Sequence, residues 1–150
     1  MKIAILNGPN LNLIGKREPE IYGKETFEDF LQELIDKFSA IEFSYFQSNV
    51  EGELISEVQR RGFDYDGIIL NPGGYTHTSV ALGDAIAAIT APVIEVHISN
   101  IFAREEFRKI SHVSGKSVGV ISGLGLKGYE LAAQWFLDQK SDPASLKKGK

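Results

Sequence analysis

A carboxylate and an imidazole stand two residues apart in an otherwise apolar run of this chain, Val93-Ile94-Glu95-Val96-His97. A buried glutamate is costly unless it is paired. On a β-strand, residues i and i+2 share one face, so Glu95 could orient the His97 ring and decide which ring nitrogen carries the proton. The pair predicts general acid–base chemistry. The plainer alternative is a histidine that is simply satisfied inside the core.

Amides and glycines follow two further apolar runs. Residues 7–10 read NGPN and residues 71–74 read NPGG, with His77 close behind. Amide side chains at such places could bind a polar ligand, although asparagine also forms turns without any other role. His77 could equally be a surface residue that caps a helix.

A longer connection, residues 13–25, carries Arg17 and Tyr22 among other polar residues. Long loops in compact domains often act as lids over a site. The alternative is an exposed aromatic ring and a solvated arginine, and the same alternative holds for Arg108.

Five short apolar runs predict β-strands, because they are rich in Ile, Val and Phe and are bounded by turn-forming residues. They cover residues 2–7, 42–47, 67–71, 93–98 and 117–122. Helical patterns alternate with them. The helices are expected at residues 27–38, from a capping box at 48–51 to Gly62, from Thr78 or Ser79 to about Ile89, at 105–112 and at 127–139.

Strict alternation of strands and helices predicts an α/β fold with a parallel sheet. Five strands are too few for an eight-stranded barrel. We therefore expect a flavodoxin-like doubly wound sheet of order 2-1-3-4-5, in one domain over residues 1–140, followed by a flexible tail at 141–150. Ligands bind such sheets at the carboxyl ends of the strands, which is where the candidate residues fall.

The composition excludes several classes of protein. The net charge is −4 and the one basic cluster lies at residues 147–150, which argues against a general nucleic-acid binder. The chain has no cysteine, so disulfides, thiolate nucleophiles and cysteine-ligated zinc are excluded. The first apolar run is too short for a secretory signal and no segment reaches the roughly 18 apolar residues that span a bilayer, so we expect a cytoplasmic protein.

Cofactor sites are poorly supported. Gly123, Gly125 and Gly128 match G-x-G-x-x-G, but no βαβ unit follows to hold the acidic ribose partner. These glycines are expected to serve a tight turn and close helix–sheet packing instead. Pro9 removes a backbone donor that a flavin loop would use, and asparagines stand where a phosphorylated receiver domain needs carboxylates to hold Mg²⁺. Three scattered histidines give no zinc site. We expect no cofactor and no metal.

Five motifs in register resemble the type II 3-dehydroquinate dehydratase family. They are residues 7–13 (NGPNLNL), 17–19 (REP) with 22–23 (YG), 71–74 (NPGG) with 76–79 (THTS), 95–100 (EVHISN) and 104–108 (REEFR). The resemblance runs from residue 2 to about 139. It implies a flavodoxin-like subunit that converts 3-dehydroquinate reversibly to 3-dehydroshikimate in the shikimate pathway. It also implies chemistry without metal or cofactor, and trimers packed into a dodecamer.

The resemblance also assigns catalytic roles. Tyr22 would be the base that removes the C2 proton, and Arg17 would lie beside it. Asn10 would hold the water that stabilises the enolate, while His97 protonates the leaving hydroxyl and Glu95 orients His97. A free phenol has a pKa of about 10, so a base working near neutrality needs a shift of about three units. A cation at 4 Å stabilises a phenolate by about 4 kcal/mol at an effective dielectric near 20, which is enough.

The remaining roles that the resemblance assigns concern substrate binding. Asn71, His77 and Arg108 would bind ring hydroxyls and the carboxylate region. The backbone N–H groups of Ile98 and Ser99 would hold the carboxylate, and Asp84 would reach a site in the neighbouring subunit.

Two other interpretations stay open at this point. One is a non-catalytic flavin- or small-ligand-binding module of the same fold. The other is a different acid–base enzyme that acts on another keto acid.

Overall fold

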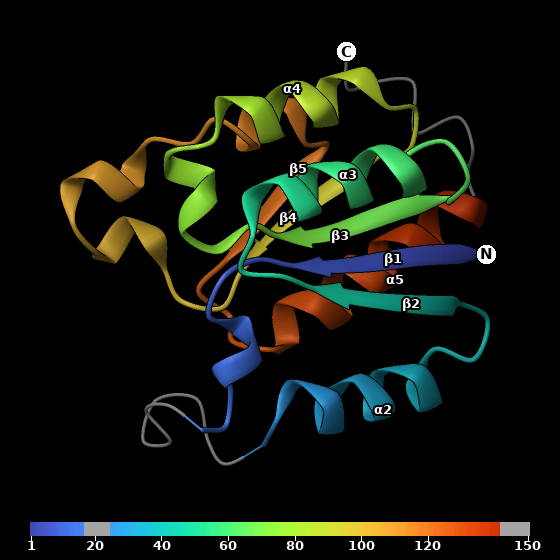
Figure 1. Ribbon diagram of the computed structural model, residues 1–150. Helices are drawn as coiled ribbons and strands as arrows, with labels where there is room; N and C mark the ends of the chain where they lie inside the picture. The colour runs from blue at the N-terminus through green and yellow to red at the C-terminus, as the bar shows by residue number, and fades with distance from the viewer. Residues whose placement is uncertain (17–24, 142–150) are drawn as a thin grey trace.

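The computed structural model describes residues 1–16 and 25–141 as a sheet of five parallel strands between helices (Figure 1). The strand order is β2-β1-β3-β4-β5, as the sequence predicts. The strands are β1 (Lys2–Asn7), β2 (Glu42–Gln47), β3 (Gly67–Asn71), β4 (Val93–His97) and β5 (Gly119–Ser122). The helices are α2 (Phe27–Lys37), α3 (Glu51–Arg61), α4 (Val80–Ala88) and α5 (Lys127–Ser141).

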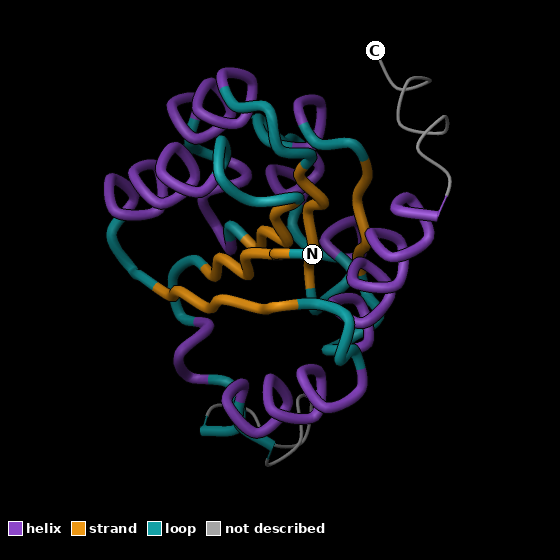
Figure 2. Tube along the Cα trace, turned by 90° about the vertical axis from the view of Figure 1, so that its right-hand side faces the viewer, coloured by secondary structure: helices purple, strands orange, loops and turns teal. Residues whose placement is uncertain are grey.

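The helices form one layer on each face of the sheet. Helices α2 and α5 pack on one face, and α3 and α4 pack on the other (Figure 2). Strand β1 shows why both layers form, since Ile3 and Ile5 belong to the first core and Ala4 and Leu6 to the second. Successive residues of a strand point to opposite faces, so a central strand that is apolar throughout needs cover on both sides. This is the flavodoxin-like architecture.

Side-chain caps fix where two of the helices begin. Thr26 and Asp29 form a reciprocal capping box at the start of α2. At the start of α4, the Ser79 hydroxyl accepts a hydrogen bond from the backbone N–H of Leu82, so Ser79 rather than Thr78 is the cap. These caps place the apolar stripes of the helices against the sheet.

The capping box expected at residues 48–51 is wrong: α3 begins at Glu51, two residues later than a Ser48 cap would place it, although it ends before Gly62 as predicted. The Ser48 hydroxyl accepts from the N–H of Val50, two residues on, and donates to Glu53 rather than to Glu51. Val50 is the N-cap and makes no side-chain cap. A serine turn therefore leads into this helix in place of a capping box.

The helix expected at residues 105–112 is also wrong. Only Glu106–Lys109 forms a short 3-10 turn. Phe107 and Ile110 are 56% and 60% exposed, so no apolar stripe is buried to stabilise a longer helix. The Ser111 hydroxyl accepts from the N–H groups of Val113 and Ser114, which offers the backbone an alternative to helical hydrogen bonds.

The G-x-G-x-x-G segment makes a turn and a close helix contact, as predicted. Gly123 and Gly125 have positive φ angles of 87° and 61° at the turn between β5 and α5. A Cβ at Gly128 would lie 3.1 Å from Val96 Cγ1 and 3.3 Å from Ile121 Cγ2, so α5 lies directly on the sheet there.

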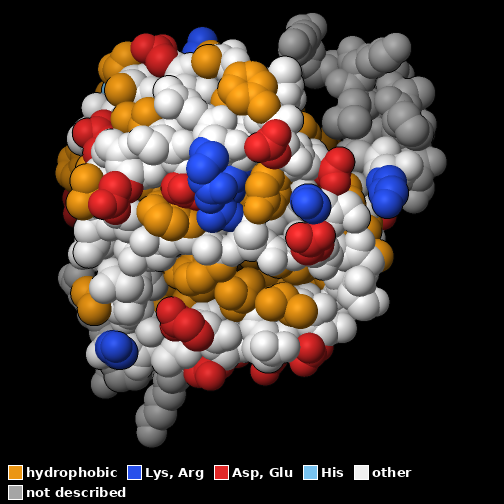
Figure 3. Space-filling model, turned by 45° about the vertical axis from the view of Figure 1, so that its right-hand side comes forward, with side chains coloured by type: hydrophobic (Ala, Val, Ile, Leu, Met, Phe, Trp, Pro, Cys, Tyr) orange, Lys and Arg blue, Asp and Glu red, His pale blue; other side chains and the backbone are white. Residues whose placement is uncertain are grey.

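Two findings concern the surface and the end of the chain. Acidic and basic side chains are interspersed on the described part of the face in Figure 3, where no extended basic patch is seen. No helix within residues 1–16 and 25–141 is both long enough and apolar enough to cross a membrane. Helix α5 includes Ser141, the first residue of the expected tail, and the rest of that tail lies outside the described residues.

Candidate active site

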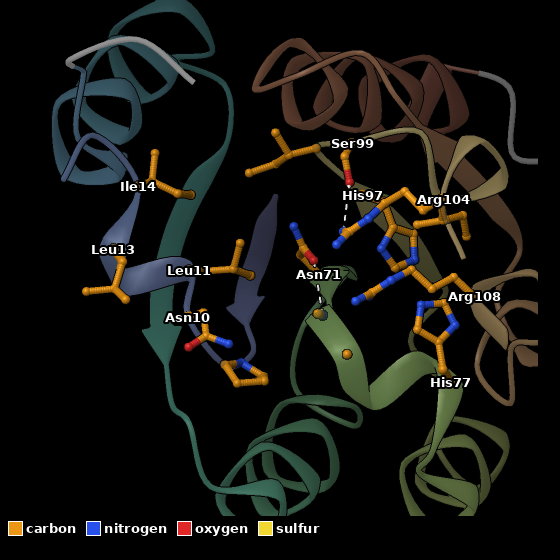
Figure 4. Close-up of a pocket in the computed structure, with 15 residues that line it drawn as sticks. Asn10, Leu11, Leu13, Ile14, Asn71, His77, His97, Ser99, Arg104 and Arg108 are labelled. Atoms are coloured by element: carbon orange, nitrogen blue, oxygen red, sulfur yellow. Dashed lines mark hydrogen bonds between the residues drawn. The ribbon is translucent and has the colours of Figure 1, made fainter. Parts of the chain in front are cut away.

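A cavity of about 350 Å³ opens at the carboxyl ends of β1, β3 and β4 (Figure 4). Figure 4 shows two walls. Asn10, Leu11, Leu13 and Ile14 lie on one side, and the histidines and arginines lie on the other, with Asn71 between them. The lining residues are Pro9, Asn10, Leu11, Leu13, Ile14, Asn71, Gly73, Gly74, His77, His97, Ile98, Ser99, Ile101, Arg104 and Arg108.

Close backbone packing builds the first wall. A Cβ at Gly8 would lie 2.5 Å from the Pro72 carbonyl oxygen, so the turns after β1 and β3 can touch only because Gly8 has no side chain. Asn10 then takes a left-handed conformation, with φ 69°, and its N–H donates to Asn49 Oδ1 at 2.9 Å. Asparagine tolerates this conformation better than most residues. The turn therefore carries the Asn10 amide to the cavity.

A buried tyrosine fixes the amide between the walls. Asn71 Nδ2 donates to the Tyr129 hydroxyl at 2.9 Å, and that hydroxyl donates to Asn7 Oδ1 at 2.8 Å. Asn71 Oδ1 accepts from the N–H of Gly73 at 3.2 Å. Burial raises the pKa of Tyr129 far above its usual range, so the phenol stays protonated and donates. These bonds leave the Asn71 amide in one orientation.

The second wall is built on the Glu95–His97 pair predicted from the sequence. His97 is 5% exposed and Glu95 is fully buried. His97 Nε2 lies 2.7 Å from Glu95 Oε1. The carboxylate also accepts from the hydroxyls of Thr76 and Ser114. Burial alone would raise the pKa of Glu95, but the hydrogen bonds from His97, Ser114 and Thr76 outweigh it and hold this pKa below its ordinary value.

An ionised Glu95 determines the state of the His97 ring. A carboxylate only accepts, so Nε2 carries a proton, and Nδ1 is the nitrogen left to exchange one with a ligand. This arrangement can support general acid–base chemistry at the cavity, since the buried carboxylate also stabilises the imidazolium.

His77 is held in a similar way by a backbone carbonyl. Its Nδ1 lies 2.7 Å from the Ile110 carbonyl oxygen, which can only accept, so Nδ1 carries the proton. The His77 ring is nearly parallel to that of His97, with 6.4 Å between centroids, and it meets Phe107 edge to face. The neutral ring therefore has Nε2 as an acceptor for a ligand hydroxyl.

Two arginines give the cavity a positive charge. Arg104 Nη1 approaches Ser99 Oγ at 3.4 Å, and Arg108 Nε binds the exposed Glu105 at 2.7 Å while its guanidinium lies over the Phe107 ring. None of the described lining residues is acidic. Guanidinium groups match carboxylates well, so the cavity favours a small anionic ligand.

Most of the predicted site residues come together here. Seven of them line the cavity: Asn10, Asn71, His77, His97, Ile98, Ser99 and Arg108. Glu95 lies behind His97 and contacts it. Asp84 is exposed on α4 and is not among the lining residues. Arg17 and Tyr22 lie outside the described residues.

Sequence reasoning assigned no role to Arg104, Thr76, Ser111, Ser114 or Tyr129. Arg104 and Thr76 fall within the family-like motifs, so their position was a usable signal. The two serines and the tyrosine gave no such signal, because nothing in the sequence pattern shows that they contact residues of β3 and β4. No group of three or more His, Cys, Asp or Glu side chains in the described ranges is arranged to hold a metal ion.

Fold and cavity together define a flavodoxin-like α/β protein with an acid–base pair facing a cationic pocket. Comparison of sequences then identifies the family. The profile described as Dehydroquinase class II matches residues 1–137, and the chain belongs to this family. A protein named 3-dehydroquinate dehydratase from Fusobacterium nucleatum subsp. nucleatum is 51% identical over 143 residues, which is 92% of this chain and 97% of the relative.

Solved structures agree with this assignment. The crystal structure of a type II dehydroquinase from Propionibacterium acnes superposes with a TM-score of 0.86 at 42% identity, covering 91% of this chain and 96% of the other. A type II dehydroquinase from Butyrivibrio crossotus gives the same TM-score at 45% identity, covering 91% and 97%. The predicted fold is confirmed.

Proposed function

We propose that this chain dehydrates 3-dehydroquinate to 3-dehydroshikimate, the reaction for which its relatives are named. The observation that carries the proposal is the buried Glu95–His97 pair, which faces a cavity lined by two arginines. A dehydration next to a ketone needs a base, a stabilised enolate and an acid for the leaving hydroxyl. The substrate is a small carboxylate, which fits the charge of the cavity.

The proposed reaction proceeds in two steps through an enolate. A base removes the C2 proton, and the electron pair of that bond moves onto the ketone oxygen. Asn10, on the first wall, holds a water that donates to this oxygen. The enolate then collapses, the C1–oxygen bond breaks, and the imidazolium of His97 protonates the departing hydroxyl, which leaves as water. The protein returns to its starting state once protons exchange with solvent.

Tyr22 is the proposed base and Arg17 the cation that activates it. Both lie outside the described residues, so their roles rest on the family motifs. The chain enters that segment directly from the cavity wall, since Leu13 and Ile14 line the cavity. Asn71, His77 and Arg108, together with the backbone at Ile98 and Ser99, are the proposed substrate-binding groups.

The direct test adds 3-dehydroquinate to the purified protein and follows the ultraviolet absorbance of the conjugated enone product. We expect turnover in the wild type, and a loss of several orders of magnitude in kcat for Tyr22→Phe. Tyr65→Phe is the control, because Tyr65 follows α3 and is not a lining residue. Arg17→Ala should lower kcat and shift the pH–rate profile. Binding without turnover in the wild type would favour a non-catalytic module instead.

We further propose a role in the shikimate pathway, which leads to aromatic amino acids, and assembly as trimers packed into a dodecamer. Asp84 is exposed on α4 and so is accessible to a neighbouring subunit. Light scattering gives the mass of the assembly, and Asp84→Asn should weaken catalysis without changing that mass. Rescue of a strain that lacks dehydroquinate dehydratase tests the pathway. A cytoplasmic location stays a prediction.

A further inference from the structure

Three hydroxyl groups lie behind the Glu95–His97 pair: two contact the Glu95 carboxylate, and the third joins these two. Thr76 comes from the 3-10 turn after β3, and Ser111 and Ser114 come from the segment before β5. Thr76 Oγ1 lies 2.5 Å from Glu95 Oε1, and Ser114 donates to Oε2. Ser111 Oγ lies 2.8 Å from both Thr76 Oγ1 and Ser114 Oγ. We call Thr76, Ser111 and Ser114 the hydroxyl cluster.

The number of protons and lone pairs on each hydroxyl group fixes the direction of the hydrogen bonds in this cluster. Ser111 Oγ accepts from the N–H groups of Val113, at 3.1 Å, and Ser114, at 2.8 Å. Both of its lone pairs are then used, so its single proton points to Thr76. Thr76 in turn donates its proton to Glu95. Ser114 Oγ lies within reach of both Glu95 Oε2 and Ser111 Oγ, and because Ser111 already accepts from two N–H groups, the Ser114 proton goes to Glu95. Every hydroxyl proton therefore runs toward the carboxylate.

As long as His97 keeps its proton on Nε2, such a cluster can be satisfied only by an ionised Glu95. A protonated carboxyl would place its own proton where a donor already points, and one hydroxyl would be left facing another donor. The ionised group, in contrast, accepts three hydrogen bonds in a site without water-exposed surface. Hydrogen bonds to the charged form favour that form, and they offset the effect of burial.

Few other charges act on this group. Along the sheet, the residues in register with Glu95 are Leu70 on β3 and Val120 on β5, and both are apolar. His97 is the ionisable side chain in direct contact, and the ring of His77 stands beyond it. The two cavity arginines lie beside the histidines in Figure 4, and neither makes an ion pair with Glu95 that the described contacts include. Within the described residues, His97 and the hydroxyl cluster are thus the groups that hold Glu95 in its charged form.

We propose that Thr76, Ser111 and Ser114 are positioning residues for the acid–base pair, which keep Glu95 ionised and so hold His97 in the tautomer that presents Nδ1 to the cavity. The consequence for turnover rests on the proposed dehydration. The consequence for the His97 tautomer does not, because it follows from the hydrogen bonds alone.

The kinetic test compares Ser114→Ala and Thr76→Val with wild type in the pH dependence of kcat for 3-dehydroquinate. Each variant removes one donor to the carboxylate, so the pKa of Glu95 rises and Glu95 takes up a proton at higher pH. We expect the acid side of the profile to move up by roughly one pH unit. Ser114→Thr keeps a hydroxyl and should restore the wild-type profile.

Ser117→Ala is the matched control, because Ser117 lies in the same segment but its hydroxyl donates to the Val113 carbonyl and not to Glu95. Its acid limb should stay in place. A merely structural role for the cluster would lower kcat in Ser114→Ala and Thr76→Val without moving that limb, and this result would overturn the proposal.

The second measurement follows the protonation of the His97 ring and does not depend on catalytic activity. In protein labelled with ¹⁵N-histidine, the ring nitrogen shifts of His97 report which nitrogen carries the proton, and a His97→Gln variant assigns its signals. We expect the Nε2-protonated neutral ring in wild type, and only the imidazolium once the pair takes up a further proton. In Ser114→Ala that proton should lie partly on Glu95, so that a neutral ring protonated on Nδ1 appears beside the imidazolium. If the wild type fails to dehydrate 3-dehydroquinate, the proposed function fails while this measurement still decides the inference. A Ser114→Ala protein that shows no Nδ1-protonated neutral ring at any pH in the acid range would refute it.

Discussion

Replacing Glu95 with glutamine separates the charge of this residue from its shape. The amide oxygen of the introduced glutamine can take the place of Oε1 and still accept from His97 and Thr76. Its NH₂ group then faces Ser114, whose proton loses its acceptor on the carboxylate, since Ser111 Oγ already accepts from two N–H groups. Glu95→Gln should therefore fold at a cost of about 1–3 kcal/mol, because one buried hydroxyl is left without an acceptor.

The expected loss is that of one negative charge beside an imidazolium. Two unit charges 4 Å apart interact by about 4 kcal/mol at an effective dielectric near 20, which sets the upper limit. The lower limit is the difference between a hydrogen bond to a charged group and one to a neutral group, about 1 kcal/mol. With 1.36 kcal/mol for each factor of ten, kcat should fall between about fivefold and about a thousandfold.

The assay follows the enone absorbance at saturating 3-dehydroquinate between pH 5 and 9, with unfolding in urea as a check on the fold. KM should change much less than kcat, because Glu95 does not line the cavity. Glu42→Gln is the control, since Glu42 is an exposed residue at the start of β2. A Glu95→Gln protein with wild-type kcat across this range would show that the buried charge takes no part in turnover.

The remaining predictions concern stability and are checked by urea unfolding. Tyr129→Phe removes the hydroxyl that pairs two buried asparagine amides, and should cost about 1–3 kcal/mol; an unchanged midpoint would contradict this pairing. Gly83→Ala puts a Cβ 2.3 Å from a backbone oxygen and should cost about 1–3 kcal/mol. Gly52→Ala, with nothing within 4 Å, should instead gain about 0.5–1 kcal/mol. Because folding lowers the pKa of Glu95 from 4.5, its stabilising effect is present above that pH and is lost as the pH falls through the folded value. The stability difference between wild type and Glu95→Gln should therefore shrink in acid, and a constant difference would show that the charge of Glu95 is not its cause.

The sheet could be predicted from sequence because its central strands are largely apolar on both faces. In β1, four consecutive residues are fully buried, and this pattern has few explanations other than a central parallel strand. Strand order followed from the alternation of strands and helices together with the family resemblance. The boundaries were less certain, since β5 begins at Gly119 rather than at residue 117.

The failures came where side chains compete with the backbone for hydrogen bonds. Ser48 looked like a helix cap by its spacing to Glu51, but it bonds Val50 and Glu53 instead. Ser111 likewise accepts from the N–H groups of Val113 and Ser114 and so starts a serine turn inside the segment 105–112 that was expected to be helical. Short hydroxyl side chains can satisfy several local arrangements, and spacing alone does not choose between them.

Only the part of the candidate site that lies on a single strand could be predicted from sequence. Glu95 and His97 had to share a face because they are two residues apart on a strand. The contact between Ser114 and Glu95 spans 19 residues and depends on the close approach of the segment before β5 to α4, where Gly83 leaves room for the His112 carbonyl. No local pattern encodes such a contact.

The same hydroxyl cluster serves both folding and the proposed chemistry. A carboxylate in the middle of β4 would destabilise the sheet if it were left without donors, because burial penalises its charge. The donors from the turn after β3 and from the segment before β5 remove that penalty and, by the same bonds, leave only His97 to face the ligand. Loss of activity in a cluster variant is therefore ambiguous by itself, since loss of stability would produce it too. A shift of the acid limb is not ambiguous, because a smaller folded fraction lowers the rate at every pH at which unfolding is constant, whereas a change in the charge of Glu95 moves the pH at which the rate falls.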